Sequence, residues 1–337
     1  MSYNIAVVGA TGAVGAEMLK ILEQRSFPVK GIKLLASSRS EGKELKFQNV
    51  DFKVQELDEN SFEDVDIALF SAGSERSREL ATVAAGAGAV VVDNSSAFRM
   101  ESDVPLIVPE INAYAVAGYK ERGIIANPNC TTIITLMALK PIHDAVKIKR
   151  VVATSYQSVS GAGAQAMEEL KLQTLAWAEG KPMEPVVFPF QIAFNVIPQV
   201  DSFLENGYTK EEMKLHHESR KILNDSTIQV TATTVRVPVF RSHCICVNVE
   251  TERKISTAQA REAFEAFPGI DVVDEPHVPR YPLPIDAEGK DNCMVGRIRE
   301  DYTVSNGLSF WVVGDQLRKG AALNAVQIAE LLIKHYI

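Results

Sequence analysis

The sequence predicts an α/β protein in which a doubly wound parallel sheet is followed by a second domain. Residues 3–8 form an apolar strand pattern that runs through a glycine-rich turn into an amphipathic helix pattern. Similar strand-to-loop units recur in "DVDIALFSAG" and "GAVVVDNSSAFRM", as expected for a parallel sheet. The length of 337 residues suits two domains, because one domain takes roughly 150 residues.

The composition excludes several classes of function. A net charge of −8 argues against a protein that binds nucleic acid through its phosphates, because such binding needs a concentrated basic surface. The chain shows neither a basic leader with a cleavage site nor an apolar run long enough to span a bilayer, so we expect a cytoplasmic protein. Its four cysteines lack the spacing of a disulfide framework or a metal site, which predicts reduced thiols and no bound metal.

The first turn, "GATGAVG", carries the glycine spacing of a dinucleotide-binding turn. Gly9, Gly12 and Gly15 follow a strand and open a helix, so the backbone can approach a pyrophosphate at the helix N-terminus. A tight turn without a ligand is the alternative, and the position of the motif favours a Rossmann-type cofactor site. The expected contacts are Gly9, Thr11, Gly12, Ala13 and Val14.

The second strand pattern ends in "SSRS" rather than in the acidic residue that would bind a ribose 2′-hydroxyl. Ser38, Arg39 and Ser40 offer one cation and two hydroxyl groups, which favours NADP over NAD. An exposed loop without a ligand is the alternative.

The next two strand patterns end in polar loops that belong at the same edge of the sheet. Ser71 and Gly73 follow the first of them and are expected to face the cofactor. Arg99 follows the second and is a candidate anion binder, although local sequence alone favours an ordinary surface arginine.

Cys130 lies where the strand-breaking residues 127–129 give way to a long apolar run, so it is expected at the start of a helix. The helix dipole and the unpaired N–H groups of that turn favour a thiolate and can stabilise an oxyanion. Cys130 is therefore a candidate nucleophile, with a half-buried structural cysteine as the alternative.

These features together resemble the aspartate-semialdehyde dehydrogenase family. The motifs are "GATGAVG", "NSSAFRM", "VPEIN", "NPNCTT", "SYQSVSGAG" and "RVPVFRSHC", and their order and spacing extend over essentially the whole chain. The resemblance implies a Rossmann-type NADP-binding domain at 1–129. It also implies a glyceraldehyde-3-phosphate-dehydrogenase-like α/β catalytic and dimerisation domain at 130–315, with a C-terminal helix in 316–337 that packs back on the first domain.

The family reduces L-aspartyl 4-phosphate to L-aspartate 4-semialdehyde with NADPH and releases phosphate, on the route to diaminopimelate, lysine, threonine and methionine. By this resemblance Cys130 is the nucleophile that forms a thioester, and Gln157 orients the substrate. His243 matches the acid/base residue, a role that calls for a group titrating near neutral pH. The same resemblance implies a homodimer or homotetramer.

The resemblance also assigns the substrate contacts. Arg236 matches the residue that binds the substrate carboxylate, and Glu211 matches the one that meets the amino group. Lys214 joins Arg99 and Asn129 around the phosphate. Spacing alone would make Glu211 and Lys214 a surface ion pair on a helix that starts with a capping box at Thr209.

Three further residues match the nicotinamide side of the cofactor site in the family: Ser160, Gly161 and Gln316, the last standing where the family usually has asparagine. Arg236 and His243 are an odd number of positions apart, so one continuous strand would point them to opposite faces. The chain is therefore expected to bend after Pro238.

Two other functions compete with this interpretation. N-acetyl-γ-glutamyl-phosphate reductase also pairs a cysteine with a histidine, but it has glycine where this chain has Asn129. A non-catalytic NADP-binding sensor would not be expected to keep Cys130, Gln157, Arg236 and His243 together.

Overall fold

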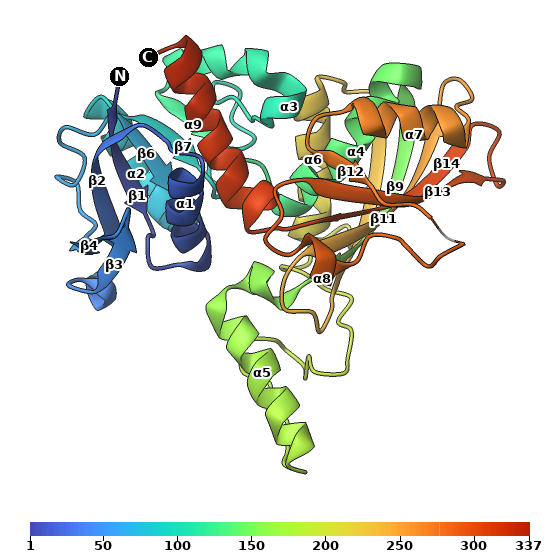
Figure 1. The fold of residues 1–337 in the computed structure, drawn as a ribbon, viewed down its shortest axis with the longest axis horizontal. Helices are drawn as coiled ribbons and strands as arrows, with labels where there is room; N and C mark the ends of the chain where they lie inside the picture. Colours follow the sequence, from blue (N-terminus) through green and yellow to red (C-terminus); the bar gives the residue numbers. More distant parts are fainter. Residues whose placement is uncertain (276) are drawn as a thin grey trace. The chain divides into compact units, whose positions relative to one another are not determined.

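The computed structural model describes residues 1–275 and 277–337, and the chain divides into two compact units. The first unit combines Met1–Asn129 with Gly320–Ile337, and the second is Cys130–Lys319. Each unit contains a six-stranded sheet with helices packed against it (Figure 1).

The sheet of the first unit has the strand order β5-β2-β1-β6-β7-β8, and all of its pairings are parallel. The chain moves outward from β1 to β2 and then returns to the other side of β1, which creates a topological switch point between β1 and β6. The predicted doubly wound sheet is confirmed. The strands are β1 (Tyr3–Val8), β2 (Val29–Ala36), β5 (Gln55–Glu56), β6 (Ile67–Phe70), β7 (Val90–Asp93) and β8 (Ile124–Ala126), with a separate hairpin of β3 (Glu44–Phe47) and β4 (Val50–Lys53).

Helices complete the core of the first unit. The C-terminal helix α9 contributes Leu323 and Val326 to the same apolar cluster as Ile5 and Met18, because its apolar residues recur at helical spacing. The buried strands β6 and β7 are apolar on both faces, as a covered parallel sheet requires. The helices are α1 (Ala13–Gln24), α2 (Ser74–Gly86), α3 (Pro109–Asn112) and α9 (Leu323–His335), with 3₁₀ turns η1 (Ser38–Ser40) and η2 (Ala113–Glu121).

The sheet of the second unit is mixed, with the order β10-β9-β11-β14-β13-β12. Strands β9 and β10 run parallel to each other, whereas β11 is antiparallel to both of its neighbours, β9 and β14. The strands are β9 (Ile148–Gln157), β10 (Gln229–Arg236), β11 (His243–Thr251), β12 (Ile270–Val272), β13 (Cys293–Asp301) and β14 (Gly307–Gly314).

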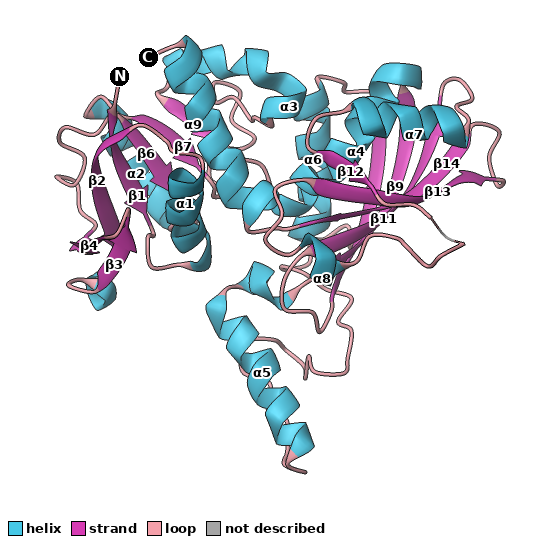
Figure 2. Cartoon of the chain, viewed as in Figure 1, coloured by secondary structure: helices cyan, strands magenta, loops and turns pink. Residues whose placement is uncertain are grey.

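Helices cover one face of this mixed sheet (Figure 2). Along β11, Ile245, Val247 and Val249 are buried against α4 and its neighbours, while Cys246 and Asn248 are only partly covered. This alternation is the period-two pattern of a strand with one covered face. The helices are α4 (Cys130–Val146), α5 (Ala164–Ala178), α6 (Lys210–Leu223), α7 (Thr257–Ala266) and α8 (Pro284–Ala287), with the 3₁₀ turn η3 (Val159–Ala162) and the π-helical turn η4 (Arg318–Ala322).

Candidate active site

Cys130 is the first residue of helix α4, as predicted, and its side chain is partly exposed. The helix follows β8 through residues 127–129, and the apolar run from Ile133 to Leu139 fixes it in the core. The thiol therefore lies at the positive end of a helix dipole of 17 residues, which favours the thiolate. The other cysteines, Cys244, Cys246 and Cys293, lie on strands of the mixed sheet.

Three predicted site residues lie at the ends of three adjacent strands. Arg236 ends β10 and pairs in register with Gln157, the last residue of β9. His243 begins β11, whose next residue pairs with the neighbour of Gln157. Arg236, Gln157 and His243 thus form one row across the sheet, and all are at least nine-tenths buried.

The predicted bend between Arg236 and His243 is confirmed. Strand β10 ends at Arg236 and β11 begins at His243, so the two residues belong to different strands on either side of β9. The turn is completed by Ser242, whose φ of 74° is in the left-handed region.

Gln157 is held by a buried polar cluster that contains a residue absent from our prediction. Its side-chain nitrogen Nε2 donates to Thr131 Oγ1 at 2.9 Å and to Glu211 Oε1 at 3.2 Å. The Thr131 hydroxyl also donates to Glu211 Oε1, at 3.4 Å. Thr131 directly follows Cys130, so its place in the first helical turn was the available signal.

Helix α6 brings Glu211 and Lys214 together. The predicted capping box is confirmed, because Thr209 accepts from the Glu212 N–H and Glu212 accepts from the Thr209 N–H. Lys214 Nζ lies 3.0 Å from Glu211 Oε2, and Glu211 is only 6% exposed, so the pair differs from the solvated ion pair that spacing alone indicates.

Asp201 is a second partner of Lys214 that the sequence did not reveal. Its Oδ2 lies 3.0 Å from Lys214 Nζ, and it reaches the lysine from a turn where its own φ is 68°. Burial lowers the pKa of Lys214, but the carboxylates of Glu211 and Asp201 outweigh this and raise it above its ordinary value. The ammonium group therefore stays charged at physiological pH.

His243 is completely buried. Its Nδ1 accepts from the Ser158 N–H at 3.2 Å and lies 3.1 Å from Ser158 Oγ. Burial and the charge of Arg236 lower the pKa of His243 to about 3. The expected titration near neutral pH is therefore not found in this structure, because the cationic ring would be both desolvated and close to a guanidinium group.

Arg236 is buried beside His243 and Cys130. Its Nη1 donates to the Ser158 carbonyl at 2.7 Å, and the guanidinium carbon lies 5.8 Å from the centre of the Phe188 ring. Burial lowers the pKa of Arg236, whereas the nearby charges of Glu211 and Cys130 raise it. An arginine remains charged under these influences, so the cluster contains a fixed cation.

Ser160, Gly161 and Gln316 lie around the same histidine. A Cβ atom at Gly161 would come within 2.9 Å of Arg236 Nη1 and 3.2 Å of His243 Nε2, so the absent side chain leaves both groups uncovered. Gln316 accepts from the Ser242 N–H at 2.7 Å and donates to Ser160 Oγ. Both ends of this amide are thus engaged within the second unit.

The first unit contains a cavity of about 450 Å³ at its switch point. Gly9 has a φ of 84°, and a Cβ atom there would approach the Ser71 carbonyl oxygen to 2.4 Å, so only glycine fits. A Cβ at Gly15 would lie 2.2 Å from the Gly9 carbonyl oxygen, so only glycine allows the helix to approach the turn this closely. The lining residues are Gly9, Thr11, Gly12, Ala36, Ser37, Ser38, Arg39, Glu56, Leu57, Ser71, Ala72 and Arg76.

These residues fit a dinucleotide. Gly12 caps helix α1, which begins at Ala13 and Val14, and leaves the N–H groups of the first turn available to a phosphate. Gly73 caps α2 in the same way. Ser40 is buried and its hydroxyl accepts from Thr11 Oγ1 at 3.2 Å, whereas Arg39 is exposed. Arg76 and Glu56 also line the cavity and were not predicted.

Arg99 and Asn129 belong to the first unit. Arg99 is 7% exposed, so it is no surface residue: its Nε donates to the Asn127 carbonyl at 2.9 Å and its Nη2 to the Asn94 carbonyl at 2.9 Å. The loop that carries it is fixed by Asp93, which accepts from Ser77 and Ser95.

Among the described residues, no group of three or more His, Cys, Asp or Glu side chains could hold a metal ion. In the same part of the chain, no helix combines the length and apolar character needed to cross a bilayer.

Comparisons with known proteins agree with this arrangement. A family model described as "Semialdehyde dehydrogenase, NAD binding domain" matches residues 4–119, and one described as "Semialdehyde dehydrogenase, dimerisation domain" matches residues 139–319. Aspartate-semialdehyde dehydrogenase of Aquifex aeolicus is 56% identical over 336 residues, which cover 99% of each chain. Aspartate-semialdehyde dehydrogenase 2 of Vibrio cholerae is 52% identical and covers 99% of this chain and 98% of its own.

A solved structure extends the likeness to three dimensions. The crystal structure of aspartate semialdehyde dehydrogenase II from Vibrio cholerae complexed with ASA matches with a TM-score of 0.98 and 50% identity, covering 100% of both chains.

Proposed function

The chain belongs to the aspartate-semialdehyde dehydrogenase family, an oxidoreductase family of amino-acid biosynthesis, and we propose that its own reaction is the reversible, NADPH-dependent conversion of L-aspartyl 4-phosphate to L-aspartate 4-semialdehyde and phosphate. The observation that carries the proposal is the row of Arg236, Gln157 and His243 on three adjacent strands, in the unit whose helix α4 begins with Cys130.

Cys130 is the proposed nucleophile. Its thiolate attacks the acyl carbon, the carbon–oxygen bond to phosphate breaks, and a thioester forms. A bound reduced nicotinamide supplies the hydride that turns the thioester into the aldehyde. The structure supports this role through the helix N-terminus, which stabilises both the thiolate and a developing oxyanion.

The charged side chains of the site are each assigned to a different group of the substrate. Arg236 is assigned to the α-carboxylate, because a guanidinium group binds a carboxylate with two parallel hydrogen bonds. Glu211 is assigned to the amino group, and Gln157 holds the substrate in orientation from the middle of the row. The phosphate is assigned to Lys214 with Arg99 and Asn129.

NADP is the proposed cofactor in preference to NAD. Ser38 and Arg39 lie in the 3₁₀ turn after β2 and line the glycine-lined cavity, and Ser40 ends the same turn. A 2′-phosphate would gain there from a guanidinium and hydroxyl groups. Ser71 lines the same cavity beside Gly9. Ser160, Gly161 and Gln316 are proposed to face the nicotinamide.

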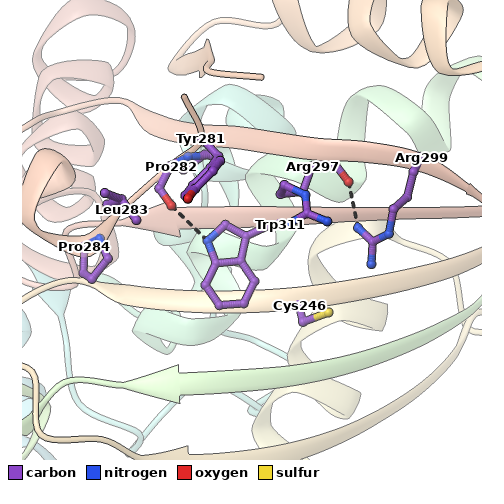
Figure 3. Close-up of a pocket in the computed structure, with 8 residues that line it drawn as sticks. All are labelled: Cys246, Tyr281, Pro282, Leu283, Pro284, Arg297, Arg299 and Trp311. Carbon is purple, nitrogen blue, oxygen red and sulfur yellow. Dashed lines mark hydrogen bonds between the residues drawn. The ribbon is translucent and has the colours of Figure 1, made fainter. Parts of the chain in front are cut away.

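We further propose a homodimer formed through the open face of the mixed sheet. This face carries an apolar hollow of about 300 Å³ in which Trp311, Tyr281 and Leu283 surround Cys246, and Figure 3 shows the indole N–H of Trp311 directed at the Pro282 carbonyl. The ring centres of Tyr156 and Trp311 lie 5.4 Å apart beside it, with the ring planes tilted by 44°. Exposed aromatic surface of this kind suits a subunit contact. A homotetramer built from such dimers is the alternative, and a cytoplasmic location completes the proposal.

Absorbance at the nicotinamide band tests the reaction. The chain is mixed with L-aspartate semialdehyde, phosphate and NADP, and parallel samples contain NAD or the variant Cys130→Ala. We expect phosphate-dependent formation of NADPH that disappears in the variant. Turnover of N-acetylglutamate semialdehyde instead would favour the reductase of that substrate, and absence of any turnover would favour a sensor.

Sedimentation tests the subunit contact. Trp311→Glu places a charge on the open face, so we expect this variant to sediment as a monomer where the unmodified chain sediments as a dimer. An unchanged mass in the variant would locate the contact elsewhere.

A further inference from the structure

Helix α5 carries two buried polar side chains to which the proposed reaction assigns no role. Glu169 is 5% exposed and Gln173 is 2% exposed, although residues of both types usually lie at the surface. They stand one helical turn apart, and Gln173 Nε2 donates to Glu169 Oε1 at 3.0 Å. Buried polar groups are retained where their hydrogen bonds are satisfied, so the other partners of these two residues indicate what they do.

Glu169 binds the segment that follows α5. We call residues 184–197 the strap, and from residue 184 to residue 193 it belongs to neither a helix nor a strand. The backbone N–H groups of such a segment need partners outside regular secondary structure. Glu169 Oε2 accepts from the N–H of Val187 and from that of Phe188, the latter at 3.4 Å. One carboxylate oxygen therefore fixes two successive residues of the strap.

Gln173 fixes the strap at two further places. Its Oε1 accepts from the N–H groups of Ile192 at 3.0 Å and Ala193 at 2.9 Å. Its Nε2 donates to the carbonyl of Glu184 at 3.1 Å, which is possible because an amide side chain is both donor and acceptor. We call the contacts of Glu169 and Gln173 with the strap the latch.

The strap also contacts Arg236, the residue assigned to the substrate carboxylate. The Ile197 N–H donates to the Arg236 carbonyl at 3.0 Å, and the Arg236 N–H donates to the Ile197 carbonyl at 2.8 Å. The Phe188 ring faces the guanidinium group, with its centre 5.8 Å from the guanidinium carbon. This distance lies within the roughly 6 Å over which an aromatic face attracts a cation. Phe188 also packs against the apolar cluster that includes Val159 and Leu170, which restrains the ring.

The surroundings of the guanidinium group restrict how a ligand can reach it. Arg236 Nη1 donates to the Ser158 carbonyl at 2.7 Å, and the absent side chain of Gly161 leaves space beside the same nitrogen. A planar guanidinium group stacks on aromatic rings through its faces and donates hydrogen bonds along its edges. With Phe188 on one face, a carboxylate is directed to an edge, where two parallel hydrogen bonds can form.

We propose that Phe188 is a positioning residue that holds Arg236 in the orientation needed to bind the α-carboxylate of the substrate, and that Glu169 and Gln173 position Phe188 through the latch. The inference rests on the proposed function, which assigns the carboxylate to Arg236. Glu169 and Gln173 act on the strap and not on the substrate, so their effect on catalysis passes through Phe188 and Arg236.

Hydrogen exchange of the full chain, followed by mass spectrometry, tests the latch without substrate. Gln173→Leu removes the acceptor of two strap N–H groups, and Glu169→Gln keeps an acceptor oxygen but loses the charge. We expect exchange in residues 186–193 to accelerate by about 5- to 100-fold in Gln173→Leu and by less in Glu169→Gln. Glu168→Gln is the matched control, because this neighbouring side chain is exposed beside Lys171, and it should leave the exchange unchanged. Unchanged exchange in both latch variants would overturn the latch.

Steady-state kinetics with L-aspartate 4-semialdehyde, phosphate and NADP test the role of Phe188. Phe188→Leu removes the aromatic ring but keeps an apolar side chain. We expect the KM for the aldehyde to rise by about 5- to 30-fold, as for the loss of a desolvated cation–π contact, with little change in kcat or in the KM for phosphate. Phe188→Tyr retains a ring and should restore the KM of the unmodified chain. Phe190→Leu, at a strap position that is 61% exposed, is the control and should change neither constant.

The two KM values distinguish positioning from a general structural role. A loosened fold would raise the KM for phosphate as well or lower kcat, because phosphate is assigned to other residues. An equal rise in both KM values, or an unchanged KM for the aldehyde in Phe188→Leu, would overturn the role of Phe188. Absence of turnover in the unmodified chain would overturn the proposed function and with it this role, while the exchange experiment would still decide on the latch.

Discussion

A single missing side chain keeps the catalytic groups accessible. Gly161 is needed for space rather than for backbone freedom, since its Cβ would meet Arg236 and His243 while its φ is not in the left-handed region. We expect Gly161→Ala to lower kcat/KM roughly 100-fold, because displacement of a catalytic group by about 1 Å has this effect. The measurement is steady-state kinetics with L-aspartate semialdehyde. Gly86→Ala is the matched control, since no atom lies within 4 Å of its Cβ.

At the cofactor, one residue decides between the two dinucleotides. Arg39→Ala removes the cation proposed to bind the 2′-phosphate, and a hydrogen bond to a charged group is worth about 1.5–3 kcal/mol. Fluorescence titration should show NADPH binding weakened by roughly 10- to 100-fold and NADH binding nearly unchanged. Arg78→Ala on the exposed side of α2 should alter neither. An equal loss with both dinucleotides would contradict the 2′-phosphate assignment.

At the scale of elements, two capping boxes allow a direct comparison. Thr209 caps α6, which carries Glu211 and Lys214, whereas Ser256 caps α7, to which we assign no site residue. Replacing either by alanine should lower the free energy of unfolding by about 1 kcal/mol in urea denaturation. Only Thr209→Ala should also raise the KM for phosphate and substrate, because the first turn of α6 positions both charged groups. Equal KM values in the two variants would show that the cap at Thr209 does not position the charged groups of the site.

The same elements show how far the sequence could lead. The strand–turn–helix around Gly9, the helix start at Cys130 and the cap at Thr209 depend on neighbouring residues, and all three are confirmed. Local sequence also required a bend between Arg236 and His243. It could not reveal that β9 lies between the two strands, because strand order depends on the packing of the whole sheet.

Partners that are distant in sequence were missed for the same reason. Asp201 meets Lys214 through an irregular loop, and Arg76 reaches the cofactor cavity from another helix. The motif around His243 suggested a group that titrates near neutral pH, and it could not reveal that this side chain is buried. Its environment is set by strands and loops from residue 158 to residue 316.

At the scale of the whole molecule, this burial couples folding to pH. His243 has a pKa of about 3 in the folded chain and an ordinary value near 6.5 when unfolded. Between these values the unfolded chain binds more protons, so the free energy of unfolding rises with pH in this window and is lost as pH falls through it. Above pH 6.5 the histidine contributes no further pH dependence.

Urea denaturation at pH 7 and pH 5 measures this contribution. From pH 7 to pH 5, the free energy of unfolding of the unmodified chain should fall by about 2 kcal/mol more than that of His243→Asn, which lacks the titrating group. Other ionisable groups affect both proteins alike, so the difference between them isolates His243. A parallel decline in both proteins would mean that His243 titrates alike in the folded and unfolded chains, and a steeper decline in the variant would reverse the predicted sign.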